Sequence, residues 1–171
     1  MIALVALVVL VGLLSVLNLV LVVGILRRLA ELQGRIREPE TMLGVGQVVD
    51  DFLTTTVDDA PVSRDLLADG TLVGFFDPAC ELCHEHLPLF VTEAAANGGP
   101  ERALAVVREG DEAGEMVSAL SPAARVVLEP RRGPVARAFH LKATPAFCRL
   151  DAAHAVSATG GSPRLGRPAR V

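Results

Sequence analysis

The chain has 171 residues, a net charge of −4 and 51% hydrophobic residues, which leaves room for one ordinary domain and a hydrophobic segment. An acidic chain lacks the positive charge that nucleic-acid binding requires, so we expect no nucleic-acid partner. Its three cysteines are too few for a disulfide scaffold. Two of them are close in sequence, which favours catalysis or metal binding.

The first 26 residues are almost wholly apolar. Residues 2–26 carry no charge. As a helix they would span about 37 Å, at roughly 1.5 Å per residue, against a hydrocarbon core of about 30 Å. The basic start, short apolar core and cleavage site of a signal peptide are missing. We therefore predict a retained transmembrane anchor over residues 1–26, followed by a helical stalk and linker over residues 27–46.

Beyond residue 46 the pattern alternates between strand and helix. We predict strands over 54–57, 72–76, 103–107, 125–128 and 146–150, and helices starting at Glu81 and covering 111–120 and 134–141. This alternation predicts an α/β domain with a central sheet over residues 47–159. The tail, residues 160–171, is rich in Gly, Pro and Arg without a periodic apolar face, so we predict that it is disordered.

The most informative stretch is residues 71–90, TLVGFFDPACELCHEHLPLF. Its apolar run ends at Asp77-Pro78, where proline stops the strand, and a helical pattern begins at Glu81. Cys80 therefore lies at or just before the first helical turn, where free backbone N–H groups and the helix dipole favour a thiolate. The three-residue spacing brings Cys83 to the same side of that turn, where the two sulfurs can form a disulfide.

A buried strand, a Cys-x-x-Cys pair, Pro88 in the following helix and Thr144-Pro145 farther along the chain occur in this order. This arrangement resembles the thioredoxin superfamily, and most of all its membrane-anchored TlpA/ResA/MauD-like thiol-disulfide oxidoreductases, over residues 48–156. The resemblance implies a central mixed sheet flanked by helices. It also implies a hairpin within residues 51–67 and a cis Thr144–Pro145 bond beside the cysteines. The family usually closes with a helix on the sheet, and the tail offers none.

The resemblance also implies an activity. Cys80 would attack a disulfide of an exported protein and Cys83 would resolve the mixed disulfide, while the loop at Thr144 and Pro145 would bind the substrate backbone. A membrane electron donor would restore the dithiol, and no cofactor is needed. His86 occupies a position where ResA-like relatives have a glutamate. It could therefore relay the proton of the resolving thiol, although a solvated surface histidine is the alternative.

Two family features are replaced in this chain. Ala79 stands where the family often has tryptophan, and Gly74 stands where thioredoxin has a buried acid. A non-catalytic thioredoxin-like scaffold therefore remains an alternative. The third cysteine, Cys148, follows Pro145 in a predicted strand and is interpreted as a small buried hydrophobic residue.

Two further alternatives use the same residues. The sequence Cys80-Glu81-Leu82-Cys83-His84 matches the attachment motif of c-type haem, which would make the protein an electron carrier. Its axial ligand would come from Met116, His140 or His154. A zinc or copper site would instead combine the cysteine pair with His84 or His86.

The side of the membrane is predicted differently by two arguments. Four arginines follow the apolar segment, at positions 27, 28, 35 and 37, and the positive-inside rule then predicts a cytoplasmic domain. The resemblance implies the opposite side, where substrate disulfides persist. We favour an extracytoplasmic domain, because large domains are translocated despite local charge.

Overall fold

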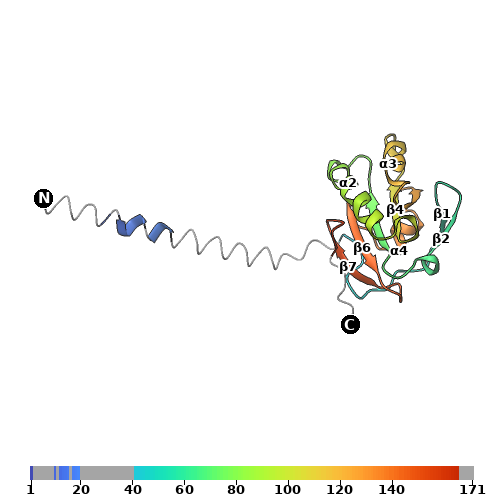
Figure 1. The fold of residues 1–171 in the computed structure, drawn as a ribbon, viewed down its shortest axis with the longest axis horizontal. Helices are drawn as coiled ribbons and strands as arrows, with labels where there is room; N and C mark the ends of the chain where they lie inside the picture. Colours follow the sequence, from blue (N-terminus) through green and yellow to red (C-terminus); the bar gives the residue numbers. More distant parts are fainter. Residues whose placement is uncertain (2–9, 11, 16, 20–40, 166–171) are drawn as a thin grey trace. The chain divides into compact units, whose positions relative to one another are not determined.

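A computed structural model describes residues 1, 10, 12–15, 17–19 and 41–165 (Figure 1). The chain divides into two compact units, Met1–Pro39 and Glu40–Val171. In the first unit the described residues from 10 to 19 are helical. The rest of the predicted anchor and stalk lies outside the described residues. Among the residues that are described, no helix has the length and apolarity needed to cross a membrane.

The second unit is built on a five-stranded mixed sheet with the order β5-β4-β3-β6-β7. Strand β3 (Leu72–Phe76) is central, and β4 (Ala103–Arg108) and β5 (Arg125–Glu129) follow it in parallel. On the other side β6 (Ala146–Leu150) and β7 (Val156–Gly160) are antiparallel. The predicted central mixed sheet is therefore confirmed.

Helices cover both faces of the sheet (Figure 1). Strand residues point alternately to opposite faces, so Val73 and Phe75 belong to one core cluster and Leu72 and Phe76 to the other. The Leu72 side packs against α2 (Glu81–Ala96) and α3 (Ala113–Leu120), and the Phe75 side against α4 (Pro134–Ala138). Short 3₁₀ turns occupy Arg64–Leu66 and Gly99–Glu101. Helix α4 is shorter than predicted, because His140 adopts a left-handed conformation with φ of 50°.

The hairpin implied by the family resemblance is present before the first core strand. Strands β1 (Leu53–Thr55) and β2 (Pro61–Ser63) form a separate two-stranded antiparallel sheet. The Thr56 hydroxyl stabilises the turn by accepting hydrogen bonds from the N–H groups of Asp58 and Ala60, at 3.3 and 3.1 Å. One hydroxyl side chain thus stabilises the turn between the two strands.

The folded unit begins earlier than the predicted boundary at residue 47. Met42 and Leu43 are buried in the core, and the Leu43 N–H donates to the Phe139 carbonyl at 3.0 Å. Val48 forms an antiparallel bridge with Ala155. Residues 41–46 are therefore part of the domain. Gly44 and Gly46 are typical of a linker. Met42 and Leu43, however, belong to the same core cluster as Val135 and Ala138 of α4.

The C-terminal segment also departs from the prediction. Residues 156–160 form the edge strand β7, which we did not predict because VSATG is short and has only one strongly apolar residue. Of the tail predicted to be disordered, residues 160–165 are described. Pro163 is buried and Leu165 packs against the core cluster under α2 and α3. Residues 166–171 lie outside the described residues. No helix closes the described domain at this end.

Candidate active site

The two cysteines lie where β3 passes into α2, at the carboxyl end of the central strand. Cys80 is the N-cap of α2 and is half-buried, and its thiol donates to the Thr144 carbonyl at 3.8 Å. Cys83 is fully buried one turn later, and its sulfur accepts the Asp77 N–H at 3.5 Å. Both are free thiols. One sulfur is thus accessible and the other lies behind it.

Asp77 holds the turn that presents Cys80. Its Oδ1 accepts the Ala79 N–H at 3.0 Å, and its backbone carbonyl accepts the Cys80 N–H at 3.0 Å. Its Oδ2 forms an ion pair with Arg108 at 2.5 Å. Sequence reasoning treated Asp77 only as part of a strand stop. In an Asx turn, an aspartate side chain accepts a hydrogen bond from the backbone N–H two residues later. An aspartate just before a predicted helix start is a signal of such a turn, and this signal could have identified the role of Asp77 in holding the loop.

Arg108 could not be found in this way. It ends β4, and it reaches Asp77 because Phe76 and Val107 are partners in the parallel register. That pairing is a tertiary feature without a local sequence signal.

His84, in the first turn of α2, bonds to the loop between β3 and α2. Its Nε2 lies 2.7 Å from the Pro78 carbonyl oxygen, and since a carbonyl only accepts, Nε2 carries the proton. Nε2 of His84 is thereby engaged by the backbone and cannot at the same time bind a haem iron.

The environments of the two thiols separate their chemistry. Burial is the largest cause that raises the pKa of Cys83, to about 12, and the adjacent Cys80 thiol raises it further. Hydrogen bonds from the Asp77 N–H and from Thr144 oppose this rise. At neutral pH Cys83 is therefore protonated, and Cys80, the accessible thiol at the helix start, is the one that can attack.

The loop before β6 lies beside the cysteine pair. The Thr144–Pro145 peptide bond is cis, as the resemblance implied, and Pro145 is buried. The carbonyl of Thr144 accepts from Cys80, and its side chain contributes to the environment of Cys83. The structure thus brings Cys80, Cys83, Thr144 and Pro145 together.

His86 packs against the core and does not contact the cysteine pair through a hydrogen bond. Its half-buried imidazole packs edge-on against the Phe147 ring, with 5.9 Å between ring centroids. Among the described residues no hydrogen bond joins it to either sulfur. Its role as a proton relay stays a prediction.

Gly74 has a steric reason. A Cβ at this position would lie 2.6 Å from Cε2 of Phe90, which covers the strand from α2. The site that holds a buried acid in thioredoxin itself is therefore filled here by an aromatic ring. Cys148 is also fully buried, in β6 opposite Val73, and burial raises its pKa, so it serves as a core residue.

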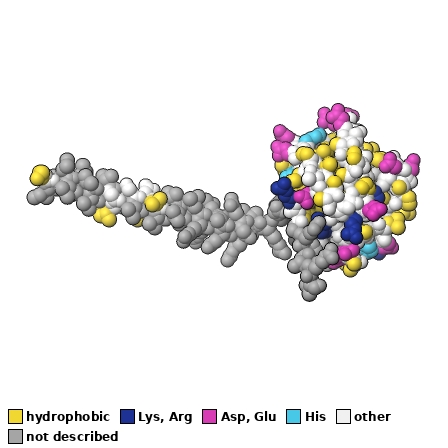
Figure 2. Space-filling model, viewed as in Figure 1, with side chains coloured by type: hydrophobic (Ala, Val, Ile, Leu, Met, Phe, Trp, Pro, Cys, Tyr) yellow, Lys and Arg dark blue, Asp and Glu magenta, His cyan; other side chains and the backbone are white. Residues whose placement is uncertain are grey.

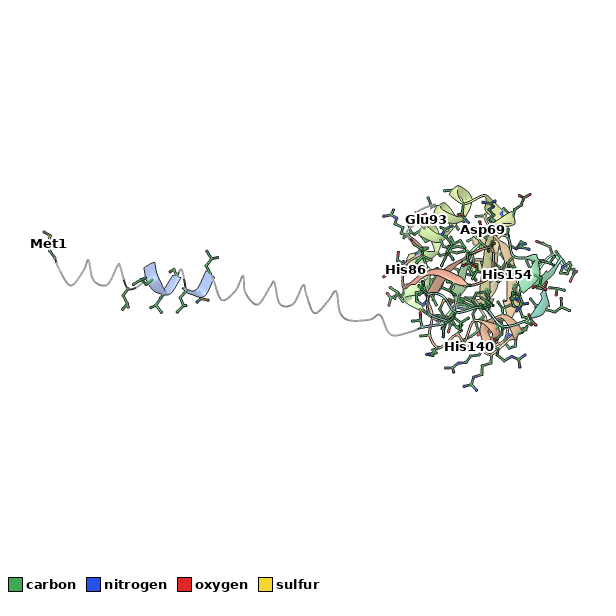
Figure 3. The ribbon with its side chains drawn as sticks, turned by 90° about the horizontal axis from the view of Figure 1, so that it is seen from below. Met1, Asp69, His86, Glu93, His140 and His154 are labelled. Atoms are coloured by element: carbon green, nitrogen blue, oxygen red, sulfur yellow. The ribbon has the colours of Figure 1, made fainter. Side chains whose placement is uncertain are left out.

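The residues considered for haem or metal do not converge. Met116 is buried in α3, and His140 pairs with Asp50 at 2.8 Å. His86, His140 and His154 lie well apart in Figure 3. Within the described part of the chain, no three histidine, cysteine or acidic side chains are grouped as a metal site requires.

Comparisons with known proteins agree with the fold. No family model matches the sequence, and no curated protein matches it. Among solved structures, a thio-disulfide isomerase from Thermus thermophilus is 22% identical, with a TM-score of 0.56, and the alignment covers 74% of this chain and 89% of that one. The thioredoxin domain of a thiol-disulfide oxidoreductase from Bacteroides vulgatus is 17% identical, with a TM-score of 0.56 and coverage of 68% and 88%.

A third structure, a secreted Mycobacterium tuberculosis disulfide oxidoreductase homologous to E. coli DsbE, is 20% identical, with a TM-score of 0.53 and coverage of 68% and 87%. The domain therefore has the thioredoxin-like fold, with a dithiol at the start of its first long helix. Its neighbours of known structure are thiol-disulfide oxidoreductases of the thioredoxin superfamily.

Proposed function

We propose that the protein is a thiol-disulfide oxidoreductase that acts through Cys80 and Cys83. The observation that carries this proposal is the asymmetry of the pair. Cys80 is accessible at the open start of α2 and faces the cis-proline loop, whereas Cys83 is buried behind it with a raised pKa. A structural pair in a non-catalytic scaffold would not need one accessible sulfur beside such a loop.

The reaction balances as two thiol-disulfide exchanges. The Cys80 thiolate attacks one sulfur of a substrate disulfide, forms a mixed disulfide and releases the other substrate sulfur as a thiolate, which takes up a proton. Cys83 then loses its proton and attacks the Cys80 sulfur, which releases the second substrate thiolate. The substrate gains two electrons, and the protein is left with a Cys80–Cys83 disulfide. A donor dithiol, which we place in the membrane, returns it to the reduced state.

We further propose that residues 1–26 anchor the protein in a membrane, with the domain on the extracytoplasmic side, and that its substrates are disulfides of exported proteins. The uncharged residues 2–26 support an anchor. The secreted nature of one solved neighbour supports the location, as does the persistence of disulfides outside the cytoplasm.

Trapping tests the roles of the two cysteines. The Cys83→Ala variant should accumulate mixed disulfides with its substrates, because Cys80 still attacks and nothing resolves the adduct. The Cys80→Ser variant should accumulate none. Equal trapping by both variants would contradict the assigned roles, and absence of trapping together with a pair that never oxidises would contradict the activity.

Labelling tests the location. A membrane-impermeant thiol reagent applied to intact cells after mild reduction should modify Cys80, as located by peptide mass. Modification only after lysis would place the domain in the cytoplasm.

A further inference from the structure

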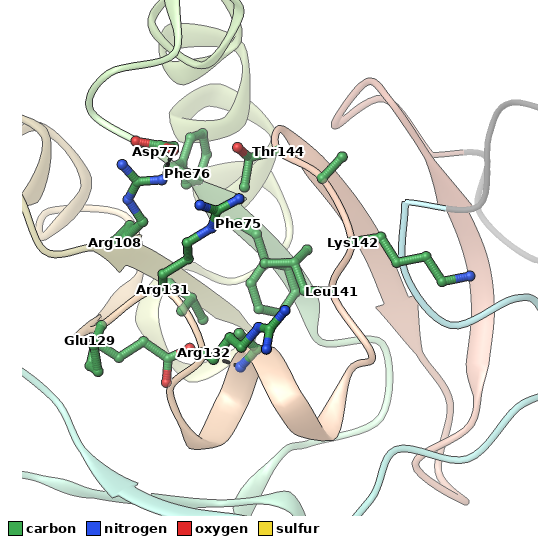
Figure 4. Close-up of a pocket in the computed structure, with 14 residues that line it drawn as sticks. Phe75, Phe76, Asp77, Arg108, Glu129, Arg131, Arg132, Leu141, Lys142 and Thr144 are labelled. Carbon is green, nitrogen blue, oxygen red and sulfur yellow. Dashed lines mark hydrogen bonds and ion pairs between the residues drawn. The ribbon is translucent and has the colours of Figure 1, made fainter.

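A cavity of about 330 Å³ adjoins the cysteine pair on the side of the cis-proline loop (Figure 4). Asp77 and Thr144, which contact the two sulfurs, form one wall. Phe75 and Val106 lie beneath, and residues 130–132 and 141–143 complete the rim. A polypeptide whose disulfide reaches Cys80 would therefore place a neighbouring side chain over this cavity.

The cavity carries more positive than negative charge. Its cations are Arg108, Arg131, Arg132 and Lys142, and its carboxylates are Asp77 and Glu129. Arg108 pairs with Asp77. Arg131 and Arg132 are exposed, and neither has an ion-pair partner among the described residues. In Figure 4 the Arg131 side chain extends toward Thr144.

Glu129 forms no ion pair with Arg131 or Arg132, because its carboxylate points to the start of α4. It is buried and accepts the N–H groups of Val135 and Ala136, at 3.0 and 2.8 Å, at the start of α4. A Cβ at Gly133 would overlap this carboxylate sterically, so glycine is needed there. The loop that carries Arg131 and Arg132 is thus held between the end of β5 and the start of α4.

The opposite side of the active-site turn has the opposite charge. A smaller cavity of about 220 Å³ shares Asp77 and Arg108 with the first and is lined by Glu109, Asp111 and Glu112. Acidic side chains also gather near α3 on the face shown in Figure 2. A negative group of the substrate is therefore attracted to one side of the cysteine pair and repelled from the other.

We propose that the cavity beside the cis-proline loop, which we call the arginine pocket, binds an aspartate or glutamate side chain that lies near the reacting cysteine of a polypeptide substrate. This inference rests on the proposed thiol-disulfide exchange and names its substrate class. Arginine forks match carboxylates with paired charge-assisted hydrogen bonds. The apolar base at Phe75 and Val106 accommodates the methylene groups of the same side chain.

Matched peptides test the proposal with the reduced full chain in a mild detergent. Each peptide contains one disulfide, and the residues two positions before and after the attacked cysteine are both glutamate or both glutamine. At low salt we expect kcat/KM to be roughly tenfold higher for the glutamate peptide than for the glutamine peptide. Hydrogen bonds between charged groups are stronger than those to a neutral amide, and salt weakens them by screening. In the Arg131→Gln/Arg132→Gln double variant, the ratio of the two rates should fall to about one.

Because both peptides are measured on the same preparation, a folding defect does not change the ratio. Arg102→Gln is the matched control. Arg102 lies just before β4, at the opposite end of this strand from Arg108, which lines the pocket. In this variant the ratio of the two peptide rates should stay near the wild-type value. A wild-type ratio of one, or a preference that survives the double variant, overturns the proposal.

Two further outcomes separate this inference from related possibilities. Oxidised glutathione is a small disulfide with free carboxylates. If its rate of reduction falls as much in the double variant as that of the glutamate peptide, the pocket binds carboxylates of small molecules, and the assignment of a polypeptide substrate is overturned. If neither peptide is reduced and Cys83→Ala forms no adduct, the proposed activity itself fails. If both peptides are reduced equally, only the arginine pocket fails.

Discussion

The raised pKa of Cys83 predicts how the second step of the reaction depends on pH. In the mixed disulfide Cys80 is bonded to substrate, so its contribution to Cys83 is removed, but burial, the largest cause, remains. Burial therefore still holds the pKa of Cys83 above that of an ordinary cysteine, so only a small fraction is ionised at pH 7, and this fraction rises about tenfold per pH unit. A cysteine with the ordinary pKa of about 8.5 would instead level off above pH 9.

The assay uses an aromatic disulfide as substrate, 5,5′-dithiobis(2-nitrobenzoate). Attack by Cys80 releases one coloured thiolate, and resolution by Cys83 releases a second, which stopped-flow absorbance follows. We expect the second phase to accelerate about tenfold per pH unit from pH 7 to 9.5 without a plateau. The Cys83→Ala variant should release one equivalent and stop. Mass spectrometry should find Cys148 unmodified, since it is fully buried.

A second phase that levels off above about pH 9 would refute the argument from burial. A second phase that bends near pH 6.5 and is flat above it would show that an internal base takes the proton. If the His86→Asn variant then restored the steady rise, His86 would be that base. Persistence of the flat profile in this variant would exclude it.

Three stability predictions follow from the core, each measured by urea unfolding of the full chain. Gly74→Ala should lower the free energy of unfolding by about 1–3 kcal/mol through overlap with Phe90, whereas Gly114→Ala, in open space on α3, should raise it by about 0.5–1 kcal/mol. Leu43→Ala should lower it by about 2–5 kcal/mol, and no effect would contradict the packing of residues 41–46. Arg149→Leu should cost about 1–3 kcal/mol, because it removes the guanidinium that donates to Asn97 Oδ1 and one of the two donors to the Gly70 carbonyl, the other being Asn97 Nδ2.

Local patterns in the sequence predicted the central elements of the fold well. Strand β3 and strand β6 have the predicted bounds, and α2 begins at Glu81 as predicted. These elements have strong apolar runs bounded by proline or glycine, so local propensity and tertiary packing favour the same structure. Strand β7 has no such pattern, and its pairing with β6 decides its conformation.

The sequence by itself determined the position of Cys80 at a helix start, since the proline stop and the helical periodicity lie within a few residues of it. It also determined the order of strand, cysteine pair and Thr144-Pro145 from which the fold was predicted. Only the tertiary structure decided that Cys83 is fully buried, that Arg108 holds Asp77 and that Arg131 and Arg132 line a cavity beside Thr144. Burial and charge pairing depend on which strands are neighbours and in what register, and residues distant in sequence meet only when the sheet has formed.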